Sequence, residues 1–157
     1  MTMTKNKNLD EFARKLQEQI IDQYRKYYSD KVIELWKNPK HMDKIPNPDG
    51  YAKVKGTCGD SMEIFIKVKN DIIIESAFLT DGCGATIACG STAADIAKGK
   101  PFTNALGLVN ANEIIKRVGG LPKEHLHCAD LASEAMRRAL ADFLYHKNSP
   151  WKKHYRK

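Results

Sequence analysis

The stretch Thr80-Asp81-Gly82-Cys83-Gly84-Ala85-Thr86-Ile87-Ala88-Cys89-Gly90 decides how the rest of this chain is interpreted. It joins an apolar, strand-like run to a helix-like run and sets Cys83 between two glycines at the junction. The free N–H groups at the start of a helix favour a thiolate, so the junction suits an exposed, ionised cysteine. A tight turn containing a buried structural cysteine explains the stretch alone equally well, and the remaining sequence must decide.

Three strand candidates lead up to this junction. Residues 62–68 alternate apolar and polar side chains, and residues 72–78 are rich in β-branched residues. Lys69-Asn70-Asp71 joins these two runs as a hairpin turn, and weaker alternation over residues 51–55 predicts the third strand. Consecutive strands with short links predict an antiparallel three-stranded sheet with helices packed against one face. The predicted fold class is therefore α+β.

Helical periodicity lies on both sides of the strands. Residues 9–28 have apolar residues at spacings of three and four, so we predict an amphipathic helix that packs on the core, with docking to a partner as the alternative. Its apolar face consists of Leu9, Phe12, Leu16, Ile20, Tyr24 and Tyr27. Ser29 can cap a second short helix. Further helices are predicted over residues 86–98, after Thr103, after a capping box at Asn110, and from Cys128 onward.

Length and composition indicate one globular domain with added ends. The chain has 157 residues, of which 42% are hydrophobic and 29% charged. We predict an N-terminal helical extension over residues 1–28, a folded domain over residues 29–146 and a basic tail over residues 147–157. No apolar run approaches the roughly 20 residues that span a bilayer. The first residues lack the apolar centre of a secretory signal, so we expect a cytoplasmic protein.

The net charge of +7 does not predict nucleic-acid binding. Much of the excess lies at the two ends, in Lys5, Lys7, Lys147, Lys152, Lys153, Arg156 and Lys157. No basic stripe with interleaved aromatic residues crosses the middle of the chain. A solvated or partner-facing tail is the favoured interpretation.

Three of the four cysteines share one kind of position. Cys58 lies between the first two predicted strands, Cys83 between the third strand and a helix, and Cys128 at the start of the last helix. Side chains at the ends of elements can converge at one rim of a small domain. Cys89 instead falls inside a helix, where a buried structural cysteine is typical.

A mixed ligand set accompanies these three thiols, because Asp60 follows Cys58 closely and His127 precedes Cys128. Thiolates suit iron–sulfur clusters and zinc, and imidazole suits zinc or iron. Zinc fingers and ferredoxins use closely spaced cysteines, whereas 24 and then 44 residues separate these three. The pattern favours an open site at the rim with three sulfurs and one replaceable ligand.

Three motifs follow one another in the order Cys58-Gly59-Asp60, Asp81-Gly82-Cys83-Gly84 and Leu126-His127-Cys128, with the predicted elements between them. Together they resemble the IscU/NifU-type iron–sulfur cluster assembly scaffold family. The resemblance covers about residues 29–145. It implies a three-stranded antiparallel sheet with packed helices, and a transient [2Fe–2S] cluster on the three cysteines. It also implies that His127 or Asp60 completes the ligand set, with Asp60 keeping the cluster labile. Zinc often occupies the site in the absence of iron.

The resemblance also implies partners. A pyridoxal-phosphate-dependent cysteine desulfurase supplies sulfur as a persulfide, Cys128 is the candidate persulfide acceptor, and apo-proteins receive the cluster. The resemblance leaves open whether the chain forms a homodimer. Family members that use an Hsp70-type chaperone carry Leu-Pro-Pro-Val-Lys before the His-Cys pair. Here Leu121-Pro122-Lys123-Glu124-His125 stands instead, which argues against chaperone docking and places a histidine where the motif has lysine.

Two alternatives to a cluster scaffold remain. The first is a zinc-bound sulfur-transfer protein that accepts persulfide from a desulfurase and stimulates it; the retained His127 favours the scaffold. The second is a thiol hydrolase with Cys128 as nucleophile and His127 or His125 as base. Neighbouring side chains on a backbone usually point apart, and the sequence supplies no orienting third group.

Overall fold

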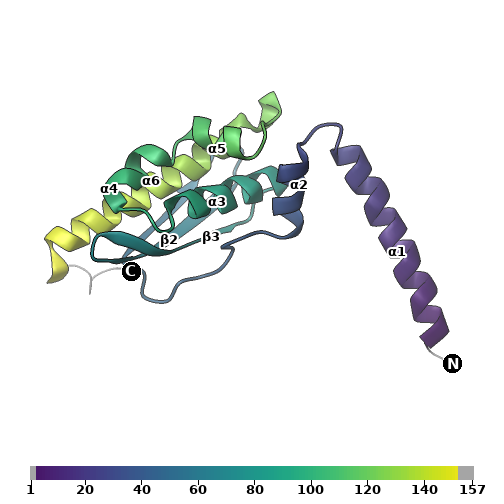
Figure 1. Cartoon of the computed structure of the whole chain (residues 1–157), viewed down its shortest axis with the longest axis horizontal. Helices are drawn as coiled ribbons and strands as arrows, with labels where there is room; N and C mark the ends of the chain where they lie inside the picture. The colour runs from purple at the N-terminus through teal and green to yellow at the C-terminus, as the bar shows by residue number, and fades with distance from the viewer. Residues whose placement is uncertain (1–2, 152–157) are drawn as a thin grey trace.

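The fold is built on a small antiparallel sheet, as expected. The computed structural model describes residues 3–151 (Figure 1). Strands β1 (Gly50–Lys55), β2 (Ser61–Lys69) and β3 (Ile72–Thr80) pair in the order β1-β2-β3, all antiparallel. At the β2–β3 hairpin, Asn70 and Asp71 have φ of 53° and 64°, as a type I′ turn requires at both central residues. The α+β prediction is confirmed.

Helices α3 (Gly84–Ala97) and α6 (Leu126–Asn148) pack on the sheet to form the main core. Helix α3 contacts β3, and α6 contacts β1 and β2. The helix α3 is rich in alanine and approaches the sheet closely: a Cβ on Gly90 would lie 2.5 Å from the ring of Phe78. This packing fixes the start of α3 beside the start of α6.

Shorter helices complete the domain where capping residues predicted them. Helix α2 (Asp30–Lys37) begins after Ser29, whose Oγ accepts a hydrogen bond from the N–H of Val32 at 3.1 Å. Helix α4 (Phe102–Leu108) precedes α5 (Ala111–Arg117), which Asn110 caps by accepting from the N–H of Glu113 at 2.9 Å. A short 3-10 helix, η1 (Lys123–His125), leads into α6.

Both edges of the sheet meet other parts of the chain. On β3, the N–H of Phe78 donates to the carbonyl of His41, and the N–H of Ile73 donates to the carbonyl of Lys100, both at 2.9 Å. On β1, the N–H of Tyr51 donates to a carboxylate oxygen of Asp142 on α6 at 2.9 Å. The backbone groups at these positions are therefore already paired.

The N-terminal helix corrects one prediction. Helix α1 (Met3–Tyr24) projects away from the domain instead of packing on its core (Figure 1). Its predicted apolar face is exposed, from 66% at Leu9 to 37% at Tyr24, and Tyr27 beyond the helix is 72% exposed. Periodicity correctly predicted an amphipathic helix, but it does not say what covers the apolar face. The core closes without α1 because α2, α3, α5 and α6 already pack together.

The ends of the chain were predicted to be basic. Lys152, Lys153, Arg156 and Lys157 lie outside the described residues, whereas Lys147 lies in α6 and pairs with Asp71. Within residues 3–151, no helix combines the length and the apolar character needed to cross a membrane.

Candidate metal centre

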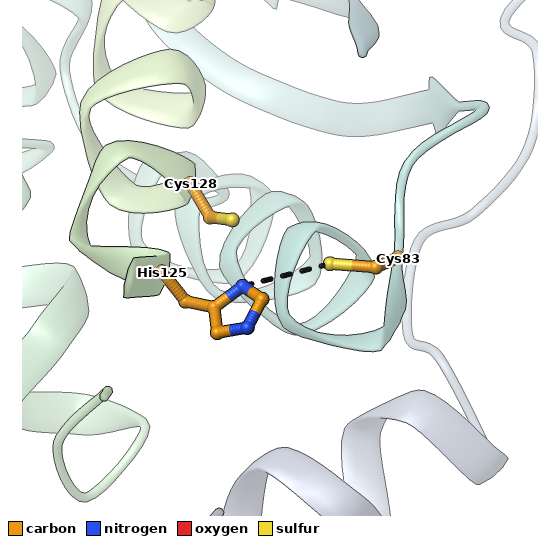
Figure 2. Close-up of side chains that lie close together, drawn as sticks. All are labelled: Cys83, His125 and Cys128. Carbon is orange, nitrogen blue, oxygen red and sulfur yellow. Dashed lines mark hydrogen bonds between the residues drawn. The ribbon is translucent and has the colours of Figure 1, made fainter. Parts of the chain in front are cut away.

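Three side chains converge at the rim where α3 and α6 begin. The ligand atoms of Cys83, His125 and Cys128 all lie within 4.8 Å of one another, and the side chains point toward a shared space (Figure 2). Cys83 Sγ and His125 Nδ1 are 4.0 Å apart. This is the one such group of histidine, cysteine and acidic side chains in the described part of the chain.

Two glycines hold Cys83 in place by allowing close approach. Cys83 is the N-cap residue of α3, with extended backbone. A Cβ on Gly82 would lie 2.7 Å from the side chain of Thr86, and one on Gly84 would lie 2.6 Å from the ring of Trp36. No real side chain fits at such distances, so the glycines let the junction close against α2 and α3. This supports the interpretation of the junction as a site.

Thr86, one turn into α3, links the groups of the site. Its buried hydroxyl lies 3.3 Å from Cys128 Sγ, 3.3 Å from an Asp60 carboxylate oxygen and 3.5 Å from Cys83 Sγ. The hydroxyl therefore ties the loop after β1 to both cysteines. The sequence analysis did not identify Thr86, because a threonine near a helix start is ordinarily a capping or structural residue.

The two thiols of the group have opposite acidities. The Cys128 thiol donates a hydrogen bond to the Cys83 thiolate, which lowers the pKa of Cys83 from 9.0 to about 4. Hydrogen bonds from Thr86 and the backbone N–H of Ala85 act in the same direction. Donating that bond, together with burial, raises the pKa of Cys128 well above its ordinary value. The site thus presents one exposed thiolate backed by one buried thiol.

A tyrosine hydroxyl fixes the orientation of the His125 ring. The Tyr28 hydroxyl lies 2.9 Å from His125 Nε2, and this contact leaves Nδ1 facing Cys83. The His127 ring stacks on the other side of His125 at 6.2 Å between centroids. Metal-binding histidines are commonly oriented in this way through their second nitrogen. Burial and the nearby Cys83 charge raise the pKa of Tyr28, so its hydroxyl keeps its proton.

The loop between β1 and β2 brings Asp60 to the edge of the group. The N–H of Ser61 donates to Asp81 Oδ1 at 2.7 Å, which ties this loop to the turn that carries Cys83. Cys58 is exposed in the same loop and is not one of the three converging ligands. Gly59, with φ of 86°, takes the left-handed conformation that reverses the chain there.

The remaining predicted residues lie close to the group or behind it. His127 Nε2 is 3.7 Å from Cys128 Sγ. Cys89 is fully buried, and burial raises its pKa to about 12, which makes it an inert core residue. Cys128 is also fully buried, so a substrate in solvent cannot reach its sulfur, and this argues against the thiol-hydrolase alternative.

The donor set fits a soft or borderline metal ion. Two sulfurs and an imidazole nitrogen match zinc and iron better than magnesium or calcium. Ligands of a tetrahedral zinc lie roughly 3.3–3.8 Å apart, so the group needs to contract by about 1 Å to close on an ion. Unlike a buried structural site, this one keeps an open side at Cys83 and Cys58, both exposed.

His125 is the candidate ligand that sequence reasoning missed. The prediction named His127, which immediately precedes Cys128, whereas η1 carries His125 round to face Cys83. The signal was its place in the Leu-Pro-Pro-Val-Lys motif, where a histidine replaces the lysine. The sequence marks this position as a histidine in place of lysine but does not indicate a ligand role for it.

Comparison with known proteins decides the family. The sequence matches the NifU-like N terminal domain over residues 27–150. The chain belongs to the NifU-like N-terminal domain family. A relative from Archaeoglobus fulgidus, named iron-sulfur cluster assembly scaffold protein IscU 1, is 44% identical over 117 residues, covering 74% of this chain and 76% of the relative. The Escherichia coli protein of that name (IscU) is 38% identical over 121 residues, covering 74% of this chain and 93% of the relative.

Solved structures share the NifU-like fold. The crystal structure of a NifU-like protein (N-terminal) from Brucella abortus aligns with a TM-score of 0.57 at 16% identity, covering 74% of this chain and 94% of that structure. At that identity the likeness concerns the fold alone. The family match begins at residue 27, so α1 lies outside it.

Proposed function

We propose that this NifU-like chain is an iron–sulfur cluster assembly scaffold. The observation that carries the proposal is the open group of Cys83, His125 and Cys128 in a chain of this family. The protein binds and passes on its cargo instead of turning over a substrate, so it is not an enzyme. Iron and sulfide are the cargo, built into a transient [2Fe–2S] cluster.

Five residues predicted from the sequence, and His125, make up the proposed ligand set. Cys83, Cys128 and the exposed Cys58 supply sulfur, with the Cys58 loop closing over the cluster. Asp60, His125 and His127 compete for the last position. An oxygen ligand such as Asp60 binds iron less firmly than a thiolate does, which suits a cluster that must leave.

Sulfur delivery uses the difference in exposure and pKa between the thiols of Cys83 and Cys128. A desulfurase persulfide first meets the exposed Cys83 thiolate, which attacks the terminal sulfur and releases the desulfurase thiolate. The sulfur of the adjacent Cys128 then attacks the outer sulfur of the Cys83 persulfide. The S–S bond at Cys83 breaks, Cys83 leaves as a thiolate, and the proton of Cys128 passes to it. Cys128 thus remains the proposed final persulfide acceptor, and its burial protects the persulfide.

Anaerobic reconstitution with iron, sulfide and a reductant tests the scaffold function. We expect a visible chromophore with about two irons for each loaded site. Cys58→Ala, Cys83→Ala and Cys128→Ala should each weaken or abolish it, whereas the matched Cys89→Ala should not. Comparing Asp60→Ala, His125→Ala and His127→Ala identifies the last ligand. Unchanged colour in all three ligand cysteine variants would refute the assignment.

The second candidate is a zinc-bound sulfur-transfer protein. The same two sulfurs and imidazole suit zinc, which is the observation in its favour. Metal analysis of the purified protein, together with a desulfurase stimulation assay, separates the two functions. Tight stoichiometric zinc, stimulation of the desulfurase and no cluster formation would favour zinc.

We also propose the partners of this chain and the division of the chain into a domain and two ends. A cysteine desulfurase supplies sulfur and apo-proteins receive the cluster, in the cytoplasm, with no part for nucleic acid. The altered segment before His125 argues against an Hsp70-type chaperone. Residues 29–146 form the scaffold domain, with residues 1–28 as an extension and residues 147–157 as a tail.

A further inference from the structure

Helix α1 and the turn that follows it carry an apolar stripe that residues 3–151 leave uncovered. The stripe consists of Leu9, Phe12, Leu16, Ile20, Tyr24 and Tyr27, and all six are exposed. Only its C-terminal end meets the domain: the rings of Tyr24 and Trp36 make an edge contact at 4.9 Å. Helices in proteins gain most of their stability by packing an apolar face, and this 22-residue helix leaves its apolar face exposed.

The stripe is large enough to hold two proteins together. Its exposed fractions correspond to roughly 700 Å² of side-chain surface, more than the largest apolar patch of most monomers. Burying that area on each of two copies removes about 1,400 Å² from water, which lies in the range of stable specific interfaces. A second copy of α1 alone would therefore suffice as a partner.

The spacing of the stripe is the same in both directions. Successive apolar positions lie 3, 4, 4, 4 and 3 residues apart, so the stripe is symmetric about residue 18. Two antiparallel copies would place Leu16 beside Ile20, Phe12 beside Tyr24, and Leu9 beside Tyr27. Leu16 and Ile20 then form an aliphatic pair, Phe12 and Tyr24 form an aromatic pair, and Leu9 packs against the Tyr27 ring. The twofold axis repeats each pair.

The corner between α1 and the domain favours antiparallel pairing. A groove of about 280 Å³ lies there, and Tyr24, Tyr28, Trp36 and Cys83 are among the residues that line it. A parallel copy would bring its own folded domain to this corner. An antiparallel copy brings the N-terminal part of its α1 to this corner and keeps its own folded domain at the far end of the pair.

We propose that α1 pairs antiparallel with α1 of a second copy of this chain. The helix is about 33 Å long, so the two metal centres lie at opposite ends of the pair. Each copy then builds its cluster on its own ligands, and the N-terminal part of the partner helix covers the groove beside Cys83. The proposal does not depend on what the metal centre binds.

Light scattering on the full chain tests the pairing. We expect twice the chain mass of 17.7 kDa, with dissociation on dilution. Leu16→Glu places a charge in the stripe of both copies and should weaken dimerisation at least about a hundredfold. Arg14→Gln changes the net charge equally on the opposite face and should leave the dimer intact. A monomer at every concentration, or an unchanged Leu16→Glu dimer, would overturn the proposal.

Short amine-reactive crosslinking of mixed light and heavy isotope-labelled chains tests the direction. The antiparallel pair brings Lys7 of one copy near Lys26 of the other, whereas a parallel pair separates them by about 28 Å. We expect crosslinks between Lys7 and Lys26 of different copies. Crosslinks only between equivalent lysines would show the parallel arrangement and contradict the proposal. Circular dichroism of Leu16→Glu verifies that the domain, which packs without α1, stays folded.

Discussion

The hydroxyl of Thr86 lies within reach of three acceptors but has only one proton to give. The Cys83 thiolate depends most on the hydrogen bond from the Cys128 thiol, while the Thr86 hydroxyl and the backbone N–H groups of Thr86 and Ala85 each contribute less. A bound cation would satisfy Cys83 and the neighbouring Asp60 carboxylate without drawing on that proton. The charges of Cys83 and Asp60 thus favour binding of a cation at this site.

The low pKa of Cys83 predicts thiol reactivity in acid. A thiol whose pKa falls from 9.0 to about 4 stays ionised throughout that interval, and its protonation begins only as the pH falls toward 4. Iodoacetamide should therefore alkylate Cys83 at pH 6 in the folded protein, as followed by peptide mass mapping. Buried Cys89 should remain unmodified until urea unfolds the chain. A Cys83 reaction that needs alkaline pH in the folded state would contradict this.

The Tyr28 hydroxyl predicts a positioning effect on metal binding. Tyr28→Phe keeps the ring but removes the group that orients His125, so zinc affinity measured by chelator competition should fall about 10- to 100-fold. Tyr27→Phe, at an exposed neighbour, is the control. In a His125→Ala background, Tyr28→Phe should have no further effect. An equal loss in both backgrounds would mean that the tyrosine acts on stability alone.

At the scale of elements, the close contact of Gly84 with Trp36 predicts a destabilising substitution. Gly84→Ala sets a methyl group against the indole ring and should lower the free energy of unfolding by about 1–3 kcal/mol. Gly107→Ala is the matched control, because Gly107 lies in α4 with open space around it. That substitution should be neutral or stabilise by up to about 1 kcal/mol. Urea unfolding measures both, and equal effects would disprove the role of the contact.

Local signals predicted most elements correctly. The strands, the 69–71 hairpin, and the caps at Ser29 and Asn110 lie where alternation and capping chemistry placed them. These features depend on neighbours in the sequence. The position of α1 depends on which distant surface covers its stripe, and no local pattern encodes that.

At the scale of the whole molecule, the site predicts strong coupling between metal and stability. Its ligands come from the β3–α3 junction and from η1 and α6, so an ion binds them together only in the folded chain. Zinc at about 1,000 times its dissociation constant should stabilise the protein by about 4 kcal/mol, measured as a rise in Tm. A chelator should reverse the rise, and Cys83→Ala should abolish it. Cys89→Ala should retain it.

The candidate site was predictable in outline. Cys83 and Cys128 converge as expected, because both stand at element ends on one rim. His125 was not predicted as a ligand, since the choice between two histidines two residues apart depends on the turn of η1. Thr86 was also missed, because its role arises only when the loop of Asp60 folds against α3.

The paired edges of the sheet limit how this molecule can associate. An open strand edge invites another strand to add by backbone hydrogen bonds, which leads to indefinite stacking and fibrils. Here segments of the same chain already take up backbone groups along β3, and Asp142 takes one on β1. Contacts between copies must then come from side-chain surfaces, which can close after two molecules. These pairings thereby protect the chain from one common route to precipitation.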